Sequence, residues 1–129
     1  MLKNEKEMKQ AKELCKNYLG ARIMIKTAIS SLESMNTKLK DADTEKEKII
    51  LSYAIERRNR QIEEANAMIE EYERCLIRLP EEERMVIDQL YGKGCKWTEV
   101  KNLEGTILSE KEVITVWKRA IRRIAGMLS

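Results

Sequence analysis

Basic residues in the last third of the chain have a type and spacing that suggest a binding chemistry. Eight lysines and arginines follow Gly92 and only four acidic residues oppose them, so this segment has a charge balance of 8 − 4 = +4. On a helix, one face would carry Lys111, Thr115, Lys118 and Arg122, with Arg119 and Arg123 beside it. Cations aligned in this way can neutralise a row of phosphates. The pattern therefore predicts a surface for a polyanion, and a solvated face of an ordinary bundle helix is the alternative.

The residues needed for metal or catalytic chemistry are missing. The chain has no histidine, and Cys15, Cys75 and Cys95 are widely spaced without a CxxC pair, which argues against a zinc site. We expect the three cysteines to be small apolar fillers in a reducing cytoplasm. No glycine-rich phosphate loop occurs, and no acid–base or nucleophilic arrangement can be assembled. The sequence therefore predicts a protein that is not an enzyme and that needs no cofactor or metal.

The composition indicates long helices. One proline, five glycines and no phenylalanine in 129 residues, with 36% charged residues, predict an all-α protein. The net charge is only +3, so a nucleic-acid partner must be argued from where the charges lie. No apolar run approaches the ~18 residues of a membrane span. The first residues lack the apolar stretch of a secretory signal, so we expect a cytoplasmic protein.

Residues 1–79 are predicted to form a coiled-coil-like helical hairpin. The first helix, Leu2 to Leu39, has heptad stripes at Leu14, Ala21, Ala28 and Met35, and at Tyr18, Ile25, Leu32 and Leu39. The second helix, ending at Leu79, has stripes at Ile55, Ile62, Ile69 and Leu76, and at Ala65, Tyr72 and Leu79, with Arg58 as a flaw. Polar residues 40–43 separate them, and Thr44 with Glu47 forms a capping box. The stripes either pack on each other, or part of the seam forms a homodimer or docks a partner helix.

Residues 80–129 are predicted to form three shorter helices in a helix-turn-helix arrangement. The expected helices run from Pro80 to Tyr91, from Trp97 to Leu103 and from Glu110 to Met127. Glycines at 92, 94 and 105 separate them, because glycine accepts the left-handed conformation that ends a helix. Ser109 and Glu112 form a second capping box at the start of the last helix, whose inner face is apolar at helical spacing.

This C-terminal segment resembles region 4 of bacterial sigma factors. The resemblance lies in residues 79–87 (LPEEERMVI), 91–94 (YGKG), 97–100 (WTEV), 109–113 (SEKEV) and 119–120 (RA). That family uses its final helix to read promoter DNA. The long helical N-terminus makes the chain more similar to ArpU-type phage and prophage regulators, Gram-positive proteins associated with late or lytic genes. Two departures from the family are Lys101, which replaces a small residue, and the longer connection from Val100 to Ser109.

The resemblance implies a sequence-specific transcription regulator that binds double-stranded DNA. The resemblance implies that Ser109, Lys111, Glu112, Thr115 and Lys118 face the DNA, and we expect Arg119 and Arg122 to contact phosphates. Glu112 could accept a hydrogen bond from cytosine, but capping is the expected role. Tyr91, Trp97 and Trp117 are expected in the core. Two alternatives are a module that docks on RNA polymerase without binding DNA by itself, and a purely structural helical protein.

Overall fold

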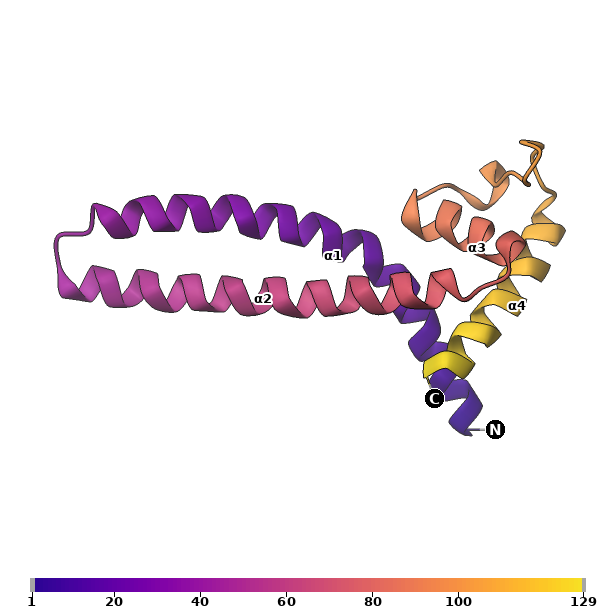
Figure 1. Ribbon diagram of the computed structural model, residues 1–129, viewed down its shortest axis with the longest axis horizontal. Coiled ribbons are helices and arrows are strands. Elements are labelled where there is room, and N and C mark those ends of the chain that lie inside the picture. The colour runs from indigo at the N-terminus through magenta and orange to yellow at the C-terminus, as the bar shows by residue number, and fades with distance from the viewer. Residues whose placement is uncertain (1, 129) are drawn as a thin grey trace. The chain divides into compact units, whose positions relative to one another are not determined.

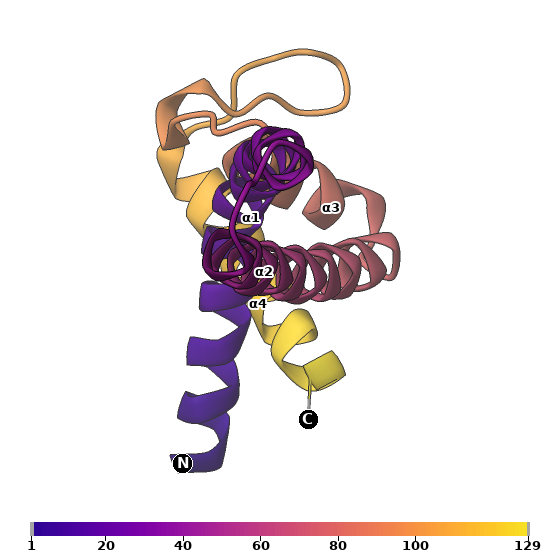
Figure 2. The same cartoon turned by 90° about the vertical axis from the view of Figure 1, so that its left-hand side faces the viewer.

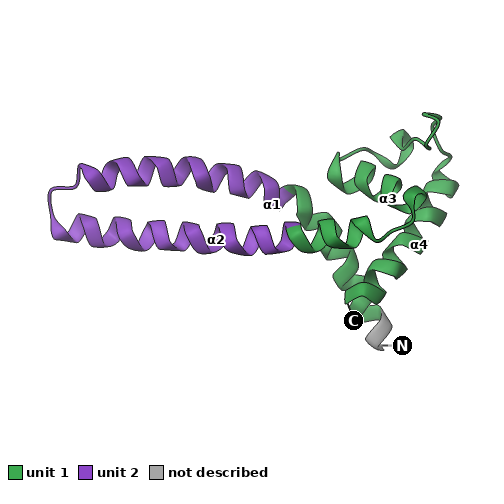
Figure 3. Ribbon diagram, in the orientation of Figure 1, with its two compact units in different colours: residues 1–19, 70–129 green, residues 20–69 purple. Residues whose placement is uncertain are grey.

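The computed structural model describes residues 2–128, which form an all-α protein as predicted (Figure 1). The long helices are α1 (Leu2–Lys40) and α2 (Glu45–Ile77), and the shorter ones are α3 (Glu81–Ile87) and α4 (Glu110–Leu128). Between α3 and α4 lie a π-helical turn, η1 (Asp88–Gly92), and a 3-10 turn, η2 (Trp97–Glu99). The chain divides into two compact units, residues 20–69 and residues 1–19 with 70–129 (Figure 3). Both long helices therefore contribute to both units.

The first unit, residues 20–69, is part of the antiparallel hairpin that was predicted for residues 1–79, and its two helices are seen almost end-on in Figure 2. Its heptad stripes face each other: Ala21, Ala28 and Ala65 are buried, and the larger seam side chains are half-buried. The amide of Glu47 donates to Thr44 Oγ1 at 3.1 Å, as expected for a cap. The Glu47 carboxylate accepts from the amide of Asp43 at 3.3 Å, one residue before the predicted position. The predicted seam is confirmed within the chain.

The second unit, residues 1–19 and 70–129, has a core at the junction of α3 and α4. Buried Val86, Leu90, Val100, Val113 and Val116 form the cluster, and Tyr91, Trp97, Leu108 and Trp117 pack against it half-buried. The predicted core positions of the two tryptophans and Tyr91 are thus confirmed. The ends of α1 and α2 join this unit, where Tyr18 and Tyr72 stack with their ring centroids 4.1 Å apart. Cys15 and Cys75 are buried, as expected for apolar fillers.

The predicted helix from Trp97 to Leu103 is wrong, so a helix-turn-helix is not confirmed. Only η2 forms, and Val100 adopts the extended conformation at φ −73° and ψ 130°. The Gln89 side chain then holds the backbone of Lys101, accepting from its amide at 2.9 Å and donating to its carbonyl at 2.8 Å. Lys101 forms an antiparallel bridge with Ile107. In a helix, the amide and carbonyl of Lys101 would bond to other backbone groups. Here the Gln89 side chain satisfies both of them, which stabilises the extended segment.

The turn between Lys101 and Ile107 is closed by local hydrogen bonds. The Asn102 side chain accepts from the amides of Glu104 at 3.0 Å and Thr106 at 2.9 Å. The Asn102 amide donates to the carbonyl of Thr106 at 2.8 Å. Gly105 has a φ of +83°, a conformation that few other residues adopt without strain. An ordered turn therefore replaces the second half of the expected supporting helix.

Candidate nucleic-acid interface

The outer face of α4 brings the predicted cations together. Its inner face, Val113, Val116, Ala120, Ile121 and Ile124, is buried with at most 3% exposure. The opposite face therefore points to solvent, and Lys111, Thr115, Lys118 and Arg122 are all exposed. Thr115 Oγ1 donates to the carbonyl of Lys111 at 2.9 Å, which leaves the oxygen lone pairs free to accept. The face thus presents three cations with a small hydroxyl between two of them.

The start of α4 is fixed by the predicted capping box. The Glu112 amide donates to Ser109 Oγ at 3.2 Å. Glu112 Oε1 accepts from the Ser109 hydroxyl at 2.8 Å and from the Ser109 amide at 3.3 Å. Both residues are exposed, but their polar atoms already serve the helix terminus. Capping, rather than a contact to a base, is therefore the role that this geometry supports for Glu112.

Two arginines of α4 pair with carboxylates of α3. Arg119 Nη2 lies 3.7 Å from Glu82 Oε2, and both side chains are at least half exposed. Arg123 Nε lies 2.8 Å from Glu83 Oε1 and donates a hydrogen bond to Oε2 at 3.1 Å. The Glu83 side chain is only 4% exposed. These pairs neutralise one flank of α4 and hold it against α3, so Arg119 is partly compensated within the chain.

The sequence analysis did not predict the contact between Glu83 and Arg123. A signal was available, because Glu83 precedes Val86, Ile87 and Leu90 by three, four and seven residues. That spacing places a residue on the apolar stripe of a helix. A carboxylate there needs a basic partner, since an unpaired buried charge is costly. Helical periodicity thus predicts that Glu83 faces inward, although it does not identify Arg123 as the partner.

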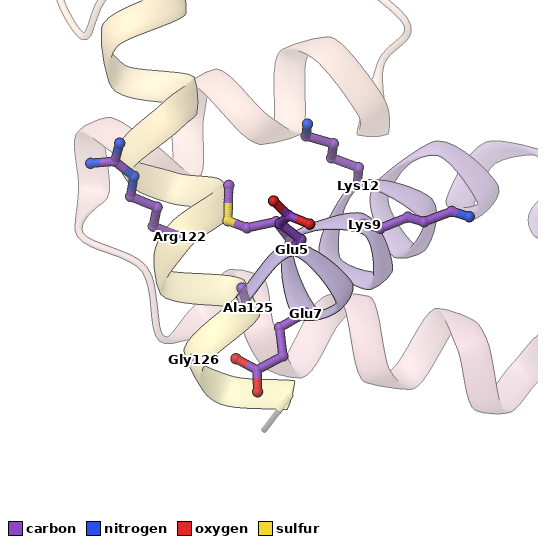
Figure 4. A pocket seen from close by; sticks show the side chains of 8 residues that line it. Glu5, Glu7, Lys9, Lys12, Arg122, Ala125 and Gly126 are labelled. Atoms are coloured by element: carbon purple, nitrogen blue, oxygen red, sulfur yellow. The ribbon is translucent and has the colours of Figure 1, made fainter. Parts of the chain in front are cut away.

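The other flank of α4 is bordered by the start of α1. An open groove lies between the two helices, lined by Glu5, Glu7, Met8, Lys9 and Lys12 of α1 and by Arg122, Ala125 and Gly126 of α4 (Figure 4). In the close view Arg122, Lys9 and Lys12 extend in different directions. Lys12 Nζ lies 5.5 Å from the centroid of the Trp117 ring, a cation–π contact. Because these segments are far apart in sequence, local patterns gave no indication that they meet.

The groups with shifted pKa values lie in the core of this unit. Burial, with a smaller contribution from Cys75, raises the pKa of the Cys15 thiol to about 12. Burial also raises the pKa of Tyr91, although the hydrogen bond that Trp117 Nε1 donates to its hydroxyl at 2.8 Å opposes the shift. Both groups are therefore neutral at physiological pH. They support the packing beneath α4 and have no part in a charged interface.

Two further findings concern other kinds of site. Within residues 2–128, no group of three or more cysteine, aspartate or glutamate side chains is placed to hold a metal ion. No helix in that part of the chain is long and apolar enough to cross a membrane.

Comparison with known proteins does not assign the chain to a family. No family model matches the chain, and neither the curated proteins nor the solved structures gave a match. The resemblance to sigma region 4 therefore stays a prediction from the residues.

Proposed function

We propose that the protein is a DNA-binding transcription regulator of the phage or prophage type, and that the outer face of α4 is its DNA-binding surface. The observation that carries this proposal is that three cations on that face lack an ion-pair partner. Among the residues that the structure describes, Lys111, Lys118 and Arg122 have no carboxylate within ion-pair distance. Neighbouring Arg119 and Arg123 do have such partners. The uncompensated charge is thus concentrated on the side of α4 that faces solvent.

The dimensions of α4 suit the major groove. The 19 residues of α4 span about 28 Å, and a groove about 12 Å wide admits a helix. Its inner face and its capped N-terminus are held by the core, so the helix is ordered before binding. Lys111 and Lys118 then reach phosphates, while Thr115 between them is short enough to approach a base edge. Four phosphate contacts, with Arg119 and Arg122 included, correspond to a log–log salt slope of about −3.6.

The test is fluorescence anisotropy with a labelled duplex from the promoter region of the protein's own operon, titrated at several salt concentrations. We expect the charge reversals Lys111→Glu, Lys118→Glu and Arg122→Glu, made together, to abolish binding. The matched control reverses three exposed lysines of the hairpin, Lys26, Lys38 and Lys40, so that the net charge changes equally. Equal loss of binding in both variants, or no binding by the natural chain at low salt, would contradict the proposal.

A second candidate function is docking on RNA polymerase without independent DNA binding. One observation favours it: the turn before α4 exposes Leu103 at 56% and Ile107 at 59%. Exposed apolar side chains on one turn can serve a contact with another protein. Polymerase retained by the natural chain but not by a Leu103→Asp, Ile107→Asp variant, together with no DNA binding, would favour this function over the first.

A further inference from the structure

The side of α2 that lies beside the seam has a second stripe of residues in the hairpin unit. The stripe consists of Ile50, Tyr53, Arg57, Gln61, Glu64 and Met68. Steps of three and four residues place them on one side of the helix. Ile50 is 58% exposed and Tyr53 is 69% exposed. The hairpin therefore shows solvent a coiled-coil-like row with apolar residues at both ends and charged residues between them.

The hairpin on its own leaves its apolar side chains poorly covered. Within residues 20–69, the buried apolar side chains are Ala21, Ala28 and Ala65, and the larger seam residues are only half-buried. An open groove lies beside the stripe and is lined by Met35, Ile50, Tyr53, Ala54, Arg57, Arg58 and Gln61. Two packed helices give one layer, and stable helical bundles cover such a layer with further helices. This side of the hairpin thus lacks a covering layer.

We infer that a second copy of the chain covers this stripe, so that two hairpins associate as an antiparallel four-helix bundle. A two-fold axis that passes between Arg57 and Gln61, level with residue 59 along α2, would bring Ile50 of one copy opposite Met68 of the second copy. The same axis would bring Arg57 within one helical turn of Glu64 of the second copy. Because a two-fold axis repeats each contact, the charged middle forms two ion pairs and the apolar ends form two hydrophobic contacts.

The charge pattern distinguishes a second copy from an unrelated helix. Arg57 and Glu64 lie on opposite sides of the axis and have opposite signs, so an antiparallel copy matches both. A partner helix with acidic residues alone would suit Arg57 and place a like charge against Glu64, and a basic helix would do the reverse. Neither Arg57 nor Glu64 has an ion-pair partner among the described residues. Self-association therefore satisfies both charges at once.

The area of the surface agrees with a dimer of moderate affinity. From Ile50 to Met68 the stripe runs for about 28 Å. The groove beside it also includes Met35 of α1, so the covered face is that of two helices side by side. Such a face is about 20 Å wide, which gives roughly 550 Å² per copy. A specific interface needs about 500 Å² on each partner. This inference does not rest on DNA binding, because α4 takes no part in it.

The test is the solution mass of the full chain without DNA, measured by sedimentation equilibrium over a wide concentration range. We expect a monomer–dimer equilibrium that Arg57→Glu or Glu64→Arg alone weakens about tenfold, because each exposed pair is lost twice. The double swap Arg57→Glu, Glu64→Arg should restore the natural dissociation constant. Ile50→Glu should weaken the dimer further, whereas Ile29→Glu, a change at an exposed residue of α1 outside the stripe, should not.

Circular dichroism of each variant shows whether its helices are intact. We expect them to be intact, because the substituted residues are exposed. Rescue by the double swap is an outcome that general damage to the fold would not produce. A chain that is monomeric at every concentration would overturn the inference. So would a dimer that is indifferent to Ile50→Glu and Arg57→Glu, or a monomer that uses Ile50 and Tyr53 to bind a different protein.

Discussion

The substitution Arg123→Met tests how α4 is held in place. Glu83 is the one buried charged residue in the described part of the chain, with 3% exposure. Its carboxylate oxygens lie 2.8 Å and 3.1 Å from Arg123 Nε. Methionine keeps much of the length and apolar stem of arginine and removes the charge and the donor. Glu83 would then remain as an unpaired carboxylate at the junction of α3 and α4. We expect this junction to become the weakest point of the C-terminal unit.

The magnitude follows from the burial of the two partners. Removing one member of a fully buried ion pair costs about 3–5 kcal/mol, and leaving a buried polar group unsatisfied costs about 1–3 kcal/mol. Arg123 is 55% exposed, so water already reaches the guanidinium and can partly solvate the carboxylate after the substitution. We therefore expect the free energy of unfolding to fall by about 2 kcal/mol. Arg119→Met, which breaks the exposed pair with Glu82, should cost less than about 0.5 kcal/mol and is the matched control.

Urea denaturation followed by tryptophan fluorescence measures this difference in the right place. Both tryptophans of the chain, Trp97 and Trp117, lie against the α3–α4 core with ring centroids 5.5 Å apart. The double variant Glu83→Met, Arg123→Met should recover most of the lost stability, because no charge is then left unpaired. The reasoning is refuted if Arg123→Met is no less stable than Arg119→Met, or if the double variant is less stable than the single one.

Other predictions concern the packing and the loop of the same unit. Gln89→Leu should remove both bonds to Lys101 and destabilise the unit by about 1–2 kcal/mol, with faster hydrogen exchange of the Lys101 amide as the local readout. Gly105→Ala should cost about 1 kcal/mol in thermal unfolding, because alanine resists the positive φ. Burial raises the pKa of the Cys15 thiol to about 12 in the folded chain, against an ordinary value of 9. The stability that the protonated thiol contributes should therefore be complete below pH 9 and disappear between pH 9 and 12. In Cys15→Ala the free energy of unfolding should decline less over that pH range. At pH 8 a thiol reagent should modify half-buried Cys95 first.

The parts of the fold that depend on periodicity and capping were predictable from the sequence. Heptad spacing specified the hairpin seam, because only an inward residue every three to four positions can be shielded by a second helix. Thr44 and Ser109 marked the helix starts, because each hydroxyl satisfies an amide that lies within the same turn. The exposed face of α4, with Lys111 and Lys118, followed from the same periodicity. Local sequence contains all the information that these features need.

The segment from Trp97 to Leu103 could not be predicted in this way, because its conformation depends on a residue outside it. Gln89 lies twelve residues before Lys101, and its side chain makes two hydrogen bonds to the Lys101 backbone. These bonds stabilise the extended conformation more than the weak helix propensity of residues 97–103 stabilises a helix. A local signal was nevertheless present in Asn102 and Gly105, a pair typical of tight turns. The pairing of Arg123 with Glu83 likewise joins residues 40 positions apart. It depends on the angle between α3 and α4, which no sequence window specifies.

The replacement of a supporting helix by a turn does not leave α4 poorly fixed. A supporting helix would hold α4 rigidly in place. Here polar contacts near both ends of α4 hold it instead. At its N-terminus the Ser109–Glu112 box satisfies free amides, and Leu108 donates to the carbonyl of Val100 at 2.8 Å. Further along, Arg123 binds Glu83 on α3. The pairs of Arg119 with Glu82 and of Arg123 with Glu83 also occupy cations on one flank of α4. The uncompensated positive charge of Lys111, Lys118 and Arg122 is thereby left on the outer face.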